Sequence, residues 1–109
     1  MALKLNVFQT VTHVATTGAV GIYTAPVGYT GVVLLAQAAN VGSQTRTVSL
    51  SHKRSSTTTE IVKTLPIEAS DTANLLPGKL VLETGDSLEV SASAGSDIKF
   101  LGSILETLN

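Results

Sequence analysis

Apolar and polar residues alternate along much of this chain, most clearly between residues 75 and 93. Two alternating runs, residues 79–83 and 87–93, flank a three-residue connection that contains Gly85. A period of two places every second side chain on the same face of a strand. The apolar residues that share a face in this way are Leu80 and Leu82 in the first run and Leu88, Val90 and Ala92 in the second. The pattern predicts a β-hairpin with Gly85 at a positive φ, because such a short connection favours one residue in that conformation.

The rest of the chain shows similar short runs, separated by clusters of turn-forming residues. Together they predict about eight strands, at residues 3–15, 20–25, 31–39, 44–52, 58–65, 79–83, 87–93 and 97–107. Residues 31–39 are apolar almost throughout, which predicts a strand buried on both faces, by the sheet itself and by a neighbour or second subunit. Residues 66–77 are the longest irregular segment, and residues 68–71 within it are compatible with one helical turn.

Short strands at regular intervals with turn residues between them are typical of β-sandwiches and jelly rolls. A chain of 109 residues has the size of one domain. We therefore predict an all-β, single-domain β-sandwich that is jelly-roll-like and mostly antiparallel, with an immunoglobulin-like strand order as the alternative. Within this one domain, residues 1–19 form an N-terminal strand or arm and residues 20–109 form the sandwich.

Few residues are charged: Asp, Glu, Lys and Arg make up 14% of the chain, and the formal net charge is −1. This balance gives no electrostatic basis for binding nucleic acid or an anionic membrane. Because 43% of the residues are hydrophobic, a surface with so few charges favours burial against other subunits. We therefore predict a homo-oligomer, with a trimer favoured. The candidate subunit contacts are Leu3, Leu5, Val7, Tyr29 and Leu101.

The absence of cysteine is compatible with folding in a reducing compartment. Polar residues interrupt the N-terminal stretch, so we expect no signal peptide. The longest apolar run, residues 31–36, is far shorter than the roughly 20 residues of a membrane-spanning helix. We expect a soluble protein.

Chemically reactive side chains are scattered along the chain and form no recognisable motif. The two histidines, His13 and His52, lie on different predicted strands without the short spacing of metal ligands, and the positive charge beside His52 opposes a cation. No glycine-rich phosphate loop and no G-x-S-x-G nucleophile motif occurs. Most carboxylates lie at predicted turns or solvated strand faces, and residues 52–54 are interpreted as the solvated basic end of a hairpin. We therefore predict no metal, no cofactor, no catalytic residue and no enzymatic activity.

Two short motifs give the chain a family likeness. Residues 23–28 read Y-T-A-P-x-G, and residues 77–86 read P-G-K-L-V-L-E-x-G-D. The apolar run at residues 31–39 lies between the two motifs, and a last strand ends at residues 101–106. In this order, over about residues 20–107, the chain resembles small tailed-bacteriophage virion structural proteins.

The resemblance implies a β-sandwich that assembles on the particle with other virion proteins, such as the major capsid protein, and that has no catalytic residues. The first interpretation is a capsid decoration or cement protein, because a compact domain without repeats suits a part present in many copies. A neck, tail or fibre-attachment module is the alternative. The implied location is the virion, after synthesis in the host cytoplasm.

Two further hypotheses come from residues outside these motifs or from single side chains. Residues 1–19 lie outside the likeness and are a candidate for an extended arm that reaches a neighbouring subunit. A carbohydrate-binding module that uses Tyr23 or Tyr29 is a different class of function, because such modules bind sugars on exposed aromatic rings.

Overall fold

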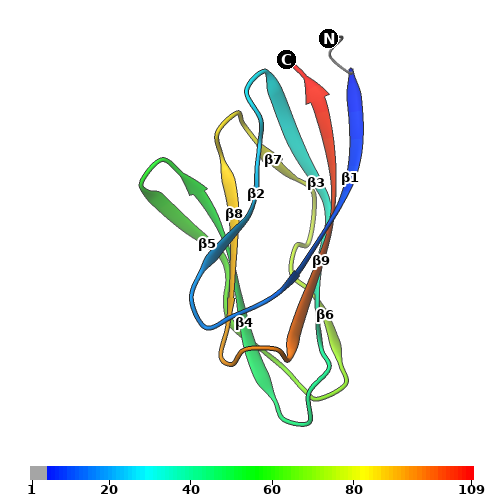
Figure 1. The fold of residues 1–109 in the computed structure, drawn as a ribbon, viewed down its shortest axis with the longest axis vertical. Helices are drawn as coiled ribbons and strands as arrows, with labels where there is room; N and C mark the ends of the chain where they lie inside the picture. The colour runs from blue at the N-terminus through cyan, green and yellow to red at the C-terminus, as the bar shows by residue number, and fades with distance from the viewer. Residues whose placement is uncertain (1–4) are drawn as a thin grey trace.

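The computed structural model describes residues 5–109, which form nine β-strands and no helix. The strands in chain order are β1 (Asn6–Val14), β2 (Val20–Thr24), β3 (Tyr29–Asn40), β4 (Arg46–Arg54), β5 (Thr57–Ile67), β6 (Thr72–Asn74), β7 (Leu80–Leu82), β8 (Ser87–Ala92) and β9 (Ile98–Leu108). Figure 1 shows that the first and last strands, β1 and β9, lie side by side.

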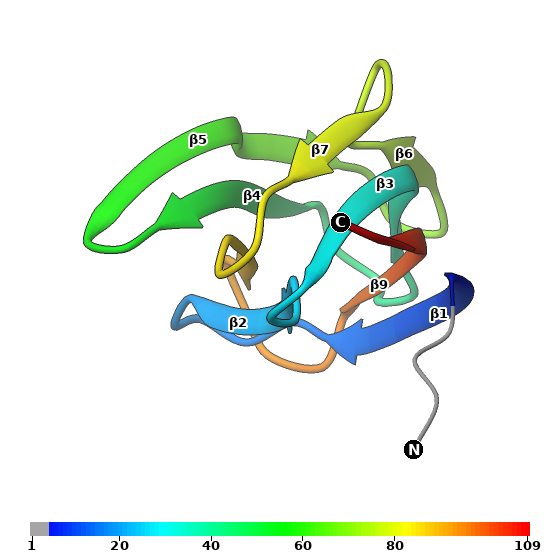
Figure 2. The same cartoon turned by 90° about the horizontal axis from the view of Figure 1, so that it is seen from above.

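The strands form two sheets that pack face to face (Figure 2). In the first, which we call the β1 sheet, the order is β1-β9-β3-β6, and β7 also pairs with β3. In the second, the β2 sheet, the order is β2-β8-β4-β5. Every pairing between strands of residues 5–109 is antiparallel. The predicted all-β, single-domain β-sandwich is confirmed.

The pairings are nested, and this nesting defines the topology. β1 pairs with β9, β2 with β8, and β4 with β5, while β3 pairs with both β6 and β7. If β6 and β7 count as one interrupted strand, the first strand pairs with the last, the second with the last but one, and so on inward to the β4–β5 hairpin. A chain whose strands pair in this nested order and are divided between two packed sheets is a jelly roll. An immunoglobulin-like order is excluded, because it places the first two strands in one sheet.

The core lies between the two sheets and is aliphatic. Inward and outward residues alternate along β3, β8 and β9, as the pleat of a strand requires. The largest fully buried apolar side chains are Leu50, Ile67, Leu75, Leu82, Leu88, Ile98, Ile104, Val33, Val48 and Val90. Each contributes about 2 kcal/mol by leaving water, so this layer is the main source of stability.

The predicted hairpin at residues 79–93 is wrong, although both of its strands exist. β7 pairs with β3 in the β1 sheet, whereas β8 lies between β2 and β4 in the other sheet. Alternation could not reveal this, because the apolar residues of both strands point into the same core. The connection instead carries the chain from one sheet to the other. The Asp86 N–H donates to the Glu83 carbonyl at 2.8 Å, and the predicted positive φ of Gly85 is confirmed at +90°.

The apolar run at residues 31–39 is not buried on both faces within this chain. It belongs to β3, in which Val33 is fully buried but the outward-facing Leu34 is 38% exposed. A β-bulge between Val33 and Leu35 interrupts the pairing with β9. The bulge turns two neighbouring leucines outward, and this accounts for the unbroken apolar run.

Residues 66–77 contain a β-turn and a short strand, and the predicted helical turn is absent. The Asp71 N–H donates to the Glu68 carbonyl at 3.1 Å, and Ser70 has a φ of +63°, so the chain reverses over these four residues. β6 then adds three residues to the edge of the β1 sheet. A strand of three residues is too short to be recognised by alternation.

The N-terminal segment is a strand of the sandwich. Asn6–Val14 pairs with β9 along its whole length without a register shift. Leu3 lies outside the described residues. An arm that reaches a neighbouring subunit stays a prediction, as does the division of the chain at residue 19.

Candidate interaction surface

The outer face of the β1 sheet carries an apolar row that crosses four strands. Phe8 of β1 lies opposite Leu105 of β9. On the other side of β9, Val32 of β3 lies opposite Leu105, and Val81 of β7 lies opposite Val32. Phe8 is 75% exposed and Val81 is 55% exposed. Neighbouring strands are about 4.8 Å apart, so the row is about 14 Å long.

Leucines from β3 and β9 widen this row. Leu34 and Leu35 face outward at the β3 bulge, and Leu101 faces outward from β9. Among the described residues that are paired in this sheet, Lys99 is the one charged residue whose side chain points to the outer face. We call this surface the outer β1 face, and its members are Phe8, Val32, Leu34, Leu35, Val81, Leu101 and Leu105.

A hollow of about 570 Å³ opens on the same side of the sheet, next to Leu101. Its lining residues are Thr12, His13, Val14, Gln37, Ala39, Lys99, Phe100 and Leu101. Most of these residues share the outward parity of Leu101 in the registers of β1, β3 and β9. The outer β1 face therefore combines an exposed apolar row with a depression that can receive side chains of a partner.

The outer face of the β2 sheet is polar. Its cross-strand pairs join Ser49 to Ser91, Ser51 to Glu89 and Lys53 to Ser87. Lys53 also forms an ion pair with Glu89 at 3.6 Å. The sandwich thus has one polar and one apolar outer face, and covering the apolar one removes apolar surface from water.

The structure places the predicted subunit contacts on different surfaces. Leu101 lies on the outer β1 face. Leu5 precedes β1 and is 71% exposed, whereas Val7 is half-buried on the inner side of β1. Tyr29 begins β3 and is half-buried, and Leu3 lies outside the described residues. Their roles as contacts stay predictions.

Sequence reasoning missed the apolar row itself. Phe8 stands among polar residues of the same parity, with Asn6 before it and Thr10 after it. Its apolar neighbours are contributed by strands far away in the chain, and only the registers align them. One signal was present in the last strand, where apolar residues occupy both parities and suggest a covered outer face.

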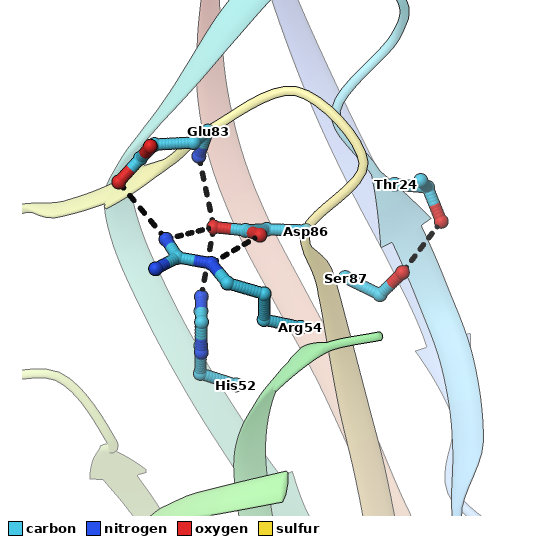
Figure 3. Close-up of polar contacts among 6 residues, drawn as sticks. All are labelled: Thr24, His52, Arg54, Glu83, Asp86 and Ser87. Atoms are coloured by element: carbon cyan, nitrogen blue, oxygen red, sulfur yellow. Dashed lines mark hydrogen bonds and ion pairs between the residues drawn. The ribbon is translucent and has the colours of Figure 1, made fainter. Parts of the chain in front are cut away.

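A buried carboxylate, Asp86, organises the connection between β7 and β8 (Figure 3). The Asp86 side chain is 2% exposed. It accepts hydrogen bonds from Arg54 Nε at 2.9 Å and Nη2 at 2.7 Å, from His52 Nε2 at 3.0 Å and from the Glu83 backbone N–H at 3.0 Å. Arg54 Nη2 also donates to Glu83 Oε2 at 2.9 Å. The end of β4 is thereby tied to the turn that links the two sheets.

This cluster corrects two interpretations of the sequence. Asp86 is not a solvated carboxylate, and residues 52–54 are not a free basic end, because His52 and Arg54 bind Asp86 and the lysine between them pairs with Glu89. The Arg54 hydrogen bonds hold the pKa of Asp86 well below its usual range, with burial opposing and the His52 and Glu83 hydrogen bonds assisting. The contact with Asp86 also raises the pKa of the Arg54 guanidinium.

A second polar contact lies inside the sandwich and joins the two sheets. The Tyr23 hydroxyl of β2 donates to Glu106 Oε2 of β9 at 2.6 Å, and Glu106 is 6% exposed. Burial first, and then the hydrogen bond and charge of Glu106, raise the pKa of the Tyr23 phenol above its usual range. Tyr23 is half-buried with its hydroxyl occupied, so it does not provide the exposed ring of a carbohydrate platform.

The two histidines lie in different surroundings. His52 binds Asp86, whereas His13 of β1 has a buried Nε2 without a hydrogen-bond partner among the described residues. Within residues 5–109, no group of three or more His, Asp or Glu side chains is arranged to hold a metal ion. The same residues include no helix that is long and apolar enough to cross a membrane.

The solved structures that share this fold include two from virus particles. A chain in the acidic stable capsid structure of Helicobacter pylori bacteriophage KHP30 superposes with a TM-score of 0.59 at 13% identity, covering 96% of this chain and 89% of that one. A chain in the crystal structure of the T13 IBDV viral particle gives a TM-score of 0.59 at 10% identity, covering 97% of this chain and 32% of that one. The KHP30 chain is therefore of similar length, whereas this chain spans about a third of the IBDV chain, at 32%.

At these identities the likeness shows the fold, a jelly roll that also occurs in chains of virus particles. No family model matches this chain, and no curated protein matches it in sequence.

Proposed function

We propose that this protein is a non-enzymatic structural component of a bacteriophage particle, and specifically a capsid decoration or cement protein that stabilises the head by binding capsid subunits. The observation that carries the proposal is the outer β1 face, an apolar surface on a jelly roll of a kind found in virus particles. The bacteriophage resemblance of residues 23–28 and 77–86 supports the same role.

The outer β1 face supplies the free energy of binding in this proposal. The strands of the β1 sheet have 9, 11, 12, 3 and 3 residues in β1, β9, β3, β6 and β7. At strand spacing they cover roughly 600 Å² in projection, which approaches the roughly 800 Å² that each partner buries in a standard protein interface. The expected partner is a capsid subunit with an apolar, weakly charged surface, because a charged surface would lose hydration against this face without gaining counter-charges.

The length of the KHP30 chain supports a small separate subunit. That chain and this one cover 89% and 96% of each other's length, so a jelly roll of this size occurs as an individual chain in a bacteriophage capsid structure. The polar clusters around Asp86 and Glu106 hold elements of the fold together, and we propose no catalytic role for them.

Quantitative mass spectrometry of purified particles tests the location. A decoration protein is expected at a copy number comparable to that of the major capsid protein. A handful of copies per particle would move the protein to the neck, tail or fibre attachment. Absence from the particle would contradict a virion role altogether.

A pair of matched charge substitutions tests the surface. Phe8→Asp places a charge in the apolar row, whereas Ser91→Asp places the same charge on the polar outer face of the β2 sheet. Burial of one Phe is worth about 1.5–3 kcal/mol, so Phe8→Asp is expected to weaken binding to particles lacking the protein by about tenfold or more. Ser91→Asp is expected to bind like wild type, and equal binding by both variants would contradict the proposed surface.

A further inference from the structure

β1 differs from the other edge strands of this sandwich. The two sheets have four edges, formed by β1 and by β6 with β7 in the β1 sheet, and by β2 and β5 in the β2 sheet. Figure 2 shows β1 at the end of its layer, with no further strand beyond it among the described residues. Such an edge presents unpaired N–H and C=O groups to any strand that can align with it.

The other three edges are interrupted. β2 has five residues and a register shift between Gly21 and Tyr23. β5 contains Pro66, has Thr64 at a φ of +50°, and shifts register twice along β4. β6 and β7 have three residues each. Short strands, bulges and prolines of this kind oppose the addition of another strand.

β1 is regular and uncharged. Its nine residues pair with β9 without a shift, from Asn6 opposite Thr107 to Val14 opposite Lys99. It contains no Pro, Gly, Asp, Glu, Lys or Arg. Charged side chains on an edge strand oppose the addition of another strand. An uncharged β1 can therefore face a copy of itself without this penalty.

The register identifies the backbone groups that point to the free edge. The Leu108 N–H donates to the Leu5 carbonyl at 2.9 Å, and the Ala15 N–H donates to the Ile98 carbonyl at 2.9 Å. In an antiparallel pair, residues that bond to the partner strand alternate with residues whose N–H and C=O point away. Odd-numbered residues of β1 therefore bond to β9. The residues whose backbone groups point to the free edge are Asn6, Phe8, Thr10, Thr12 and Val14.

We propose that β1 pairs with β1 of a second copy of this chain, antiparallel and about a two-fold axis at Thr10. In this register Thr10 faces Thr10, Phe8 faces Thr12, and Asn6 faces Val14. Every residue whose backbone groups point to the free edge then meets another residue of the same kind in the second copy. About ten backbone hydrogen bonds join the two copies. A shift by one residue would place the backbone groups at the free edge of one copy opposite residues of the other copy that are already bonded to β9. The alternation of backbone groups along β1 therefore restricts the register.

A two-fold pair fits these edges better than the trimer expected from the sequence. A ring of three would join β1 to a different edge of the next copy, and each of those edges is interrupted. The two-fold axis between antiparallel strands is perpendicular to the sheet, so both outer β1 faces lie on the same side. The dimer would thus offer one larger apolar surface to the partner under the proposed function, although the pairing itself does not depend on that function.

Analytical ultracentrifugation over a range of micromolar concentrations tests the pairing in purified protein. Wild type is expected to sediment as a dimer at the higher concentrations. Thr10→Pro removes an N–H that points to the free edge and none that bonds to β9, and proline is tolerated at such positions. This variant is expected to be a monomer with a circular dichroism spectrum like that of wild type. A wild type that stays monomeric throughout would overturn the inference.

Single cysteines test the register, because the chain has no cysteine of its own. Thr10→Cys places its two sulfur atoms across the axis, where paired Cα atoms are about 5.5 Å apart and a disulfide forms on oxidation. Thr12→Cys faces Phe8, and its two copies are about 14 Å apart, too far for a disulfide. Cross-linking of Thr10→Cys alone supports the pairing, whereas cross-linking of both variants, of neither, or of Thr12→Cys alone overturns it. Because no particle is needed, these results stay distinct from the test of the proposed function.

Discussion

Replacing Asp86 by asparagine keeps the shape of the side chain and removes its charge. The wild-type carboxylate accepts four hydrogen bonds, from Arg54, His52 and the Glu83 backbone. The new amide would turn an NH₂ group toward these donors. Removing one partner of a buried ion pair costs about 3–5 kcal/mol. Since the Arg54 side chain is 54% exposed and can be hydrated, we expect the lower end, a loss of about 3 kcal/mol in the free energy of unfolding.

Urea and thermal unfolding followed by circular dichroism measure this loss. A change of about 3 kcal/mol corresponds to about 12–15 °C in the Tm of a domain of this size. Asp97→Asn is the matched control, because Asp97 forms one ion pair with Arg46 at 2.8 Å and is 25% exposed. Partly exposed pairs of this kind are worth up to about 1 kcal/mol, so the control is expected to lose at most that amount.

The pH dependence gives an independent check with a defined sign. In the folded protein the pKa of Asp86 is lowered, first by Arg54, so at acidic pH the unfolded chain binds the proton more readily. The stabilisation is therefore fully present above the ordinary carboxyl pKa near 4 and is lost as the pH falls below it. The difference between wild type and Asp86→Asn should narrow between about pH 5 and pH 2. A difference under about 1 kcal/mol at neutral pH, or one that stays constant into acid, would refute the role of this cluster.

Two further substitutions test the connection and the interior. Gly85→Val is expected to lower the free energy of unfolding by about 1 kcal/mol or more. Gly85 has a φ of +90°, and no atom lies within 4 Å of an added Cβ, so backbone strain is the cause of this loss. Gly95→Val, at an equally open site, is the control, and equal melting temperatures of both variants and wild type would contradict the reasoning. Tyr23→Phe removes the hydroxyl that donates to the buried Glu106 carboxylate. It is expected to lower the free energy of unfolding, measured by urea denaturation, by about 1–2 kcal/mol. Because the pKa of Tyr23 is raised, the midpoint of its absorbance titration in a Tyr29→Phe background should lie above about 10. The free energy of unfolding should fall as the pH rises above about 10, because the folded state holds the phenol proton more tightly than the unfolded chain. A midpoint at the ordinary value would count against the burial of Tyr23.

Local features of this protein were accessible from the sequence. The alternation in β8 correctly placed Leu88 and Val90 on the buried side, because a strand with one apolar face must turn that face to the core. The positive φ of Gly85 followed from a short connection between two strands, and such a connection needs it in either topology. Many short strands without helical periodicity indicated an all-β sandwich for the same local reason.

Partners across the sheets were decided by the tertiary structure alone. Alternation records which side of a strand is apolar, but the backbone groups that bond one strand to another are the same in every residue except proline. The sequence therefore could not show that β7 and β8 belong to different sheets. It could not place Phe8 beside Leu105, or Arg54 on Asp86, which lies 32 residues away. The candidate interaction surface exists only after folding, because its residues come from four strands that only the register of the sheet brings into one row.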